Sequence, residues 1–181
     1  MKKLSVFFLP LLLFAVFSCE GPIGPEGPQG PQGQPGENGV NILGAVFEIE
    51  TDFNSENDFS TLFTFPADVI EVFESDVVLV YLLWDVTEDD LPILRLMPQT
   101  IYLDDGSFQY NFDYTYFDVN FFLDGAYDFT TLEDSWTQNQ TFRVVVVPAD
   151  FANGRYDYSN YEATIKRLKL EDIPVRKYTA Q

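Results

Sequence analysis

The run VVLVYLLWDV, residues 77–86, is apolar at nearly every position. A short run of this kind, rich in β-branched and aromatic residues, is typical of a central strand that is covered on both faces. A second run, FRVVVV at residues 142–147, has the same character and is closed by Pro148. These two runs predict a domain whose core is a β-sheet buried on both sides.

The residues around these runs alternate between apolar and polar with period two. Phe108, Tyr110, Phe112 and Tyr114 are separated by polar residues, and Phe117, Val119, Phe121 and Leu123 repeat the alternation. We expect the two segments to form a hairpin with one aromatic and one acidic face. Further strands are expected at residues 46–50, 59–65 and 94–103, the last bent or interrupted at Pro98.

One helix is indicated near the C-terminus. Ser159 and Glu162 have the spacing of a capping box, and Tyr161, Ile165 and Leu168 form an apolar stripe. We expect this helix to cover one end or edge of the sheet, and residues 130–140 to form a long polar loop. The predicted fold of residues 42–181 is an all-β head, an antiparallel β-sandwich or jelly-roll-like domain of seven or eight strands with one C-terminal helix.

The N-terminal residues 1–18 have the pattern of a secretory signal peptide. Lys2 and Lys3 precede an apolar run that ends at Ser18, and Pro10 argues against a retained membrane helix. The only cysteine of the chain, Cys19, follows directly, so there is no disulfide framework and no thiolate metal site.

Residues 19–41 combine this cysteine with a collagen-like tract. Glycine occupies every third position of it, at Gly21, Gly24, Gly27, Gly30, Gly33, Gly36 and Gly39. Strict period three with proline between is typical of collagen, because only glycine fits at the axis of three polyproline II chains. The tract predicts a stalk, either in a homotrimer or as an extended stalk of a monomer, and the sequence leaves both open.

Charge and composition exclude several functions. The chain has 29 acidic and 10 basic residues and no histidine. A net charge of −19 makes nucleic acid an unfavourable partner and repels anionic membrane surfaces. Without histidine there is no Ser-His-Asp site and no imidazole ligand for a metal. No pair of carboxylates stands out by spacing, so we expect no enzyme.

Two features of the sequence are candidates for ligand binding. Glu88, Asp89 and Asp90, and also Asp104 and Asp105, are local clusters of oxygen ligands that calcium could use, although both have the composition of turns. No other cofactor is indicated. Trp136 lies in the polar segment 130–140, where an exposed indole is a candidate platform for stacking on a sugar ring.

The whole layout resembles the short collagen-like lipoproteins of Gram-negative bacteria. The resemblance rests on the lipobox-like Val16-Phe17-Ser18-Cys19, on the Gly-X-Y triplets, and on the head segments DVVLVYLLW and FRVVVVPADF. It implies export, acylation of Cys19 and attachment to the outer membrane or cell surface. The implied function is structural or adhesive and not catalytic. The alternatives are a glycan-binding or calcium-dependent accessory lipoprotein and, third, a carboxylate hydrolase.

Overall fold

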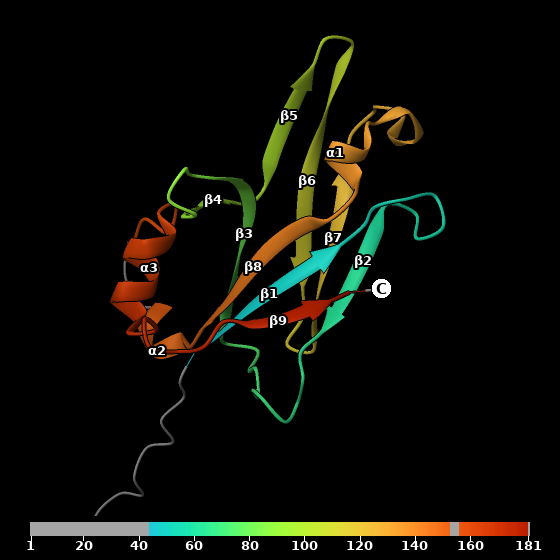
Figure 1. Ribbon diagram of the computed structural model, residues 1–181. Helices are drawn as coiled ribbons and strands as arrows, with labels where there is room; N and C mark the ends of the chain where they lie inside the picture. The colour runs from blue at the N-terminus through green and yellow to red at the C-terminus, as the bar shows by residue number, and fades with distance from the viewer. Residues whose placement is uncertain (1–43, 153–155, 181) are drawn as a thin grey trace, which may run out of the picture. The chain divides into compact units, whose positions relative to one another are not determined.

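Two β-sheets face each other in the computed structural model of the protein, which describes residues 44–152 and 156–180 (Figure 1). The first sheet has the strand order β4-β3-β8-β1-β9 and the second the order β2-β7-β6-β5. The strands are β1 (Ala45–Thr51), β2 (Ser60–Thr64), β3 (Val77–Val86), β4 (Pro92–Leu96), β5 (Gln99–Leu103), β6 (Gly106–Tyr114), β7 (Asp118–Asp124), β8 (Gln140–Val147) and β9 (Arg176–Thr179). The all-β sandwich expected from the sequence is therefore confirmed at this level.

Strands β3 and β8 lie next to each other in the middle of the first sheet, with Val80 opposite Val144. Both of these side chains are fully buried between the sheets, while Tyr81 and Val145 are fully buried on the other face. Burying an aliphatic side chain of this size stabilises the fold by about 1.5–3 kcal/mol. Burial on both faces is confirmed for residues 78–82 and 144–147, whereas Leu83 and Trp84 are half-buried and Asp85 and Val86, at the end of β3, are exposed.

Strands β6 and β7 form the predicted hairpin in the second sheet, with Phe112 opposite Phe121. The inner face is aromatic, and Phe121 stacks on Phe142 of the first sheet with 4.6 Å between ring centroids. The expectation for Phe117 was wrong, because it lies in the turn before β7 and is 61% exposed. Pro98 interrupts the segment 94–103 as expected, since β4 belongs to the first sheet and β5 to the second.

Helix α3 (Tyr161–Leu168) covers the outer face of the first sheet rather than an end or edge. Ile165 and Leu168 pack there among the side chains that β1, β3 and β8 direct away from the second sheet. The capping residue is Asn160, whose side chain accepts a hydrogen bond from the Ala163 amide at 2.9 Å. The expected cap at Ser159 is therefore wrong by one residue.

Three elements differ from the sequence-based expectation. Strand β9 pairs in parallel with β1, so the first sheet is not purely antiparallel, and the described residues hold nine strands. The segment 130–140 is not one long loop, because it contains helix α1 (Asp134–Thr137) and the end of a 3-10 turn (Phe129–Thr131). A further short helix, α2 (Ala149–Ala152), follows β8.

The sandwich has two ends, which we name by the course of the chain. At the entry end β1 and β3 begin and β8 finishes, with Ala45 opposite Val146 and Val77 opposite Val147. At the far end β3 finishes and β8 begins at Gln140, opposite Thr51. Gly44, the first described residue, directly precedes β1 and lies at the entry end (Figure 1).

Candidate binding site

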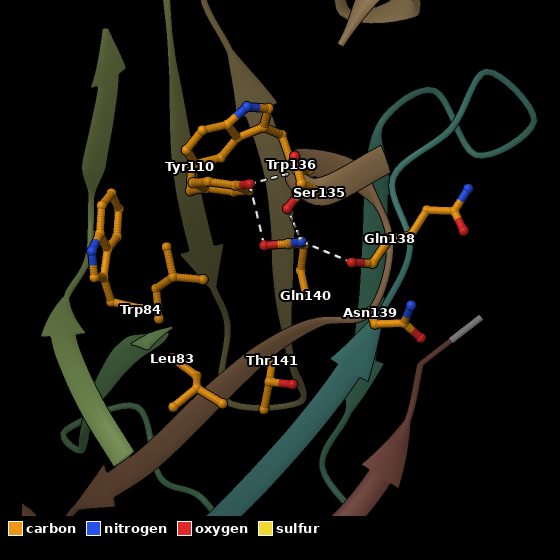
Figure 2. Close-up of a pocket in the computed structure, with 10 residues that line it drawn as sticks. Leu83, Trp84, Tyr110, Ser135, Trp136, Gln138, Asn139, Gln140 and Thr141 are labelled. Carbon is orange, nitrogen blue, oxygen red and sulfur yellow. Dashed lines mark hydrogen bonds between the residues drawn. The ribbon is translucent and has the colours of Figure 1, made fainter. Parts of the chain in front are cut away.

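A pocket of about 400 Å³ opens at the far end of the sandwich (Figure 2). It lies between the last residues of β3, the inner face of β6, helix α1 and the first residues of β8. The described residues that line it are Leu82, Leu83, Trp84, Tyr110, Ser135, Trp136, Gln138, Asn139, Gln140 and Thr141. None of these ten side chains carries a formal charge.

The chain's two tryptophans both line this pocket, and both are half-buried. Figure 2 shows Trp84 on one side of the pocket and Trp136 on the other, with Tyr110 beside Trp136. Trp136 packs edge-on against Phe108, with 6.1 Å between ring centroids. The guanidinium of Arg95 lies over the ring of Trp84, 3.5 Å from its centroid. These contacts fix both indoles while leaving part of each exposed to the pocket.

Hydrogen bonds from Tyr110 and Gln140 hold helix α1 at the mouth of the pocket. The Tyr110 hydroxyl donates to the Trp136 carbonyl at 2.5 Å and lies 3.2 Å from Gln140 Oε1. Gln140 Nε2 donates in turn to the carbonyls of Ser135 and Gln138, at 3.1 and 2.8 Å. Burial raises the pKa of Tyr110 far above its ordinary value, so its hydroxyl remains a donor across the neutral range.

The polar rim of the pocket is made of exposed amides. Asn139 has a φ of 53°, in the left-handed region that asparagine tolerates better than most residues. Its backbone N–H donates to Asp52 Oδ1 at 2.7 Å, which secures this turn. Figure 2 shows the side chains of Gln138 and Asn139 at this rim, directed away from Tyr110. Each free amide offers both donors and acceptors.

The predicted calcium ligands lie in two different exposed turns. Glu88, Asp89 and Asp90 follow β3, while Asp104 and Asp105 connect β5 to β6. Asp105 is also within hydrogen-bond distance of the Tyr127 hydroxyl, at 3.2 Å. Among residues 44–152 and 156–180, no group of three or more acidic or cysteine side chains is arranged to hold a metal ion. Calcium binding at either turn stays a prediction.

The best-formed ionic cluster lies elsewhere, on the outer face of the first sheet. Glu48 pairs with Arg143, and its other carboxylate oxygen accepts from Lys177 Nζ at 2.7 Å. Burial acts to raise the pKa of Glu48, but the hydrogen bonds from Lys177 and Arg143 outweigh it and leave the pKa lowered. These three residues join β1, β8 and β9 across the sheet, so we interpret the cluster as structural.

Sequence reasoning identified one residue of the pocket and missed the others. Trp136 was recognisable because it is an aromatic residue in a polar segment. Tyr110 has the spacing of a core residue and is indeed 1% exposed, so nothing in the sequence marks its hydroxyl as part of a site. Trp84 belongs to the run that identified the central strand. The predicted lipidation site Cys19 and the seven stalk glycines lie outside the described residues.

Comparisons of the chain with known protein families, with curated proteins and with solved structures find no match. In the part of the chain that the structure describes, no helix has the length and apolar character needed to cross a membrane.

Proposed function

We propose that the protein is a non-catalytic adhesive surface protein, anchored by an acyl group on Cys19, whose head binds a neutral saccharide. The observation that carries this proposal is the far-end pocket, where Trp84 and Trp136 flank a cavity whose polar groups are uncharged. The anchor and the surface location rest on the N-terminal sequence and on its resemblance to collagen-like lipoproteins.

The chemistry of the pocket fits a sugar better than other ligand classes. Small-ligand sites typically have volumes of roughly 300–1,000 Å³ and combine aromatic walls with a few polar groups that fix orientation. An indole can cover the C–H face of a pyranose ring, and polar side chains inside the pocket such as Thr141 and Gln140 can pair with its hydroxyls. The net charge of −19 disfavours polyanionic glycans at long range, which leaves neutral saccharides as the preferred class.

The position of the pocket also fits an adhesive role. Gly44, the first described residue, lies at the entry end, and the pocket lies at the opposite end of the same sandwich. If the N-terminal tract holds the head from the entry end, a ligand on another surface would meet the pocket at the opposite end.

The test is binding of neutral oligosaccharides, first on a glycan array and then by calorimetry with the best ligand. Trp136→Ala should weaken binding by about tenfold or more, since loss of one stacking aromatic costs on the order of 1–2 kcal/mol. The matched control is Tyr102→Ala, which removes an aromatic ring that is 83% exposed on β5 and does not line the pocket. Absence of any glycan ligand, or equal affinity of both variants, would contradict the proposal.

The same experiment separates the calcium-dependent alternative. The pocket has no charged side chain among its described lining residues, so we expect the affinity to be the same in calcium and in EDTA. Binding that disappears in EDTA would instead favour a calcium site at one of the acidic turns, at Glu88–Asp90 or at Asp104 and Asp105.

A further inference from the structure

A second hollow, at the entry end, is apolar and contains exposed aromatic rings. This entry-end groove has a volume of about 620 Å³ and lies between the β2–β3 connection and the β6–β7 turn. Phe73, Tyr116 and Phe117 line it and are 43, 47 and 61% exposed. Soluble monomers rarely leave large contiguous apolar patches uncovered, so such a groove indicates a contact surface.

Acidic side chains border the groove. Glu71 and Glu74 alternate with its apolar residues in the β2–β3 connection, and both are exposed. Neither makes an ion pair or a side-chain hydrogen bond with another described residue. The groove therefore fits an occupant that is apolar at its centre and positively charged at its margin.

Three exposed cations lie at the same end of the molecule, with the exposed acids Glu171 and Asp172 between two of them in the chain. Lys166, Lys169 and Arg176 are exposed on α3, at its C-cap and on β9, and none is ion-paired within residues 44–152 and 156–180. Leu170, next to Lys169, packs close to Gly44, the first described residue. Arg176 begins β9 opposite Phe47, near the start of β1. We name these three residues the entry-end cations.

From this complementarity we infer that the entry-end groove binds a second copy of this chain, through the face that carries the entry-end cations. If the N-terminal tract gathers several chains, their heads are held at a high local concentration. A contact between two different surfaces of identical subunits closes into a ring when the rotation between copies permits, and a threefold ring matches a three-chain stalk. This contact is distinct from the saccharide pocket, which it leaves free at the far end.

The exposed area shows that the contact alone is weak. The three rings are each about half covered already, so full burial would remove only about 300 Å² of aromatic surface from water. A stable interface buries roughly 800 Å² on each partner. The heads should therefore associate only when the N-terminal tract and the anchor hold them at an effective concentration in the millimolar range.

The test uses the full chain in its native membrane, with a tagged and an untagged copy of the protein expressed together, so that untagged chain recovered covalently with the tagged one under denaturing conditions reports joining between copies. A zero-length carbodiimide joins carboxylates to amines in contact, and mass spectrometry identifies peptides joined between copies. We expect Glu71 or Glu74 of one copy joined to Lys166 or Lys169 of another. Phe73→Ser with Phe117→Ser keeps every reacting group but removes two rings, and should lower the yield by at least about tenfold.

The control is Leu62→Ser with Tyr102→Ser, which removes two exposed apolar side chains outside the groove. Its yield should equal that of the unmodified chain, and circular dichroism of both variants should show the same melting transition. Cross-linking that is unaffected by the groove substitutions would overturn the inference. Joined peptides that contain neither Glu71 nor Glu74 would overturn it as well. If the groove instead mediates binding to protein-free phosphatidylethanolamine vesicles, its partner is the bilayer, and this result would also overturn the inference.

Discussion

Replacing Tyr110 by phenylalanine should separate the stability of the head from the order of its pocket. The hydroxyl of Tyr110 is buried and donates to the Trp136 carbonyl at 2.5 Å. Its loss removes one hydrogen bond, worth about 1 kcal/mol net, and leaves a carbonyl that water at the pocket mouth can partly satisfy. We expect the free energy of unfolding to fall by about 1–1.5 kcal/mol, a decrease in Tm of roughly 3–8 °C for a domain of this size.

The matched control is Tyr81→Phe, because both hydroxyls belong to buried tyrosines and donate to a backbone carbonyl, and they differ in their location. Tyr81 is also fully buried, and its hydroxyl donates to the Tyr158 carbonyl at 2.7 Å, on the outer face of the first sheet. Both substitutions should lower the Tm by a similar amount. Only Tyr110→Phe should loosen helix α1 and expose Trp136, since the Tyr81 hydroxyl makes its hydrogen bonds on the other face of the sheet.

Acrylamide quenching of tryptophan fluorescence measures this difference without any ligand. The chain has two tryptophans, so a Trp84→Phe background reports on Trp136 alone. Quenching should increase for Tyr110→Phe and remain unchanged for Tyr81→Phe. Equal quenching in both variants, with Tm lowered in both, would refute the assignment of Tyr110 as the residue that positions Trp136.

Three further predictions address other parts of the molecule. Glu48→Gln should make the stability of the head less sensitive to acid. The lowered pKa of Glu48 contributes stability above about pH 4.5, and this contribution is lost as the pH falls. The Tm of the variant should therefore change less with pH below that value than the Tm of the unmodified head. The unmodified head should lose stability above about pH 10, because burial raises the pKa of Tyr81 to about 12 and the unfolded chain ionises first; a Tm that stays constant to pH 11 would contradict this. Cys19→Ser should release the protein from the membrane fraction and abolish labelling by a fatty-acid probe, whereas unchanged fractionation would argue against the anchor.

The central strands were predictable because their burial follows from their local amino-acid composition. A strand covered on both faces is apolar along its buried length, and residues 77–84 of β3 and 144–147 of β8 satisfy that rule without reference to distant residues. The β6–β7 hairpin was predictable for a similar reason, since its alternation and its turn are contiguous in the sequence.

Strand β9 illustrates what local pattern does not reveal. Its sequence is Arg-Lys-Tyr-Thr, with three exposed residues and one half-buried residue, Tyr178. What makes it a strand is the free edge of β1, together with the contacts of Tyr178 with Phe47 and Phe63 at ring-centroid distances of 6.0 and 5.3 Å. Those partners lie more than a hundred residues earlier in the chain, so no window around residues 176–179 contains the reason for the strand.

The binding pocket depended on the same kind of distant pairing. Trp136 could be selected as an exposed aromatic, but its orientation depends on Tyr110, 26 residues earlier in the chain. Helix α1 has only four residues, too few to carry an apolar stripe from which it could be recognised. The predicted calcium ligands were chosen by local spacing alone, which does not reveal whether a third ligand approaches from another element.

The location of the pocket follows from the topology of the sandwich. After β7 the chain leaves the second sheet and must cross to β8 in the first, across sheets that pack about 10 Å apart. This crossing occurs at the far end, and α1 together with residues 138–139 forms its last part before Gln140 joins the first sheet. A connection that spans the gap between two sheets cannot fill it as strands do, so its side chains and the last residues of β3 enclose a cavity. The two indoles line that cavity because one belongs to the crossing segment and the other to the end of a central strand. At the entry end the connection that crosses between the sheets is β2–β3, and its groove-lining side chains are apolar or acidic. The two hollows share no lining residue, so a substitution in one should leave the other intact.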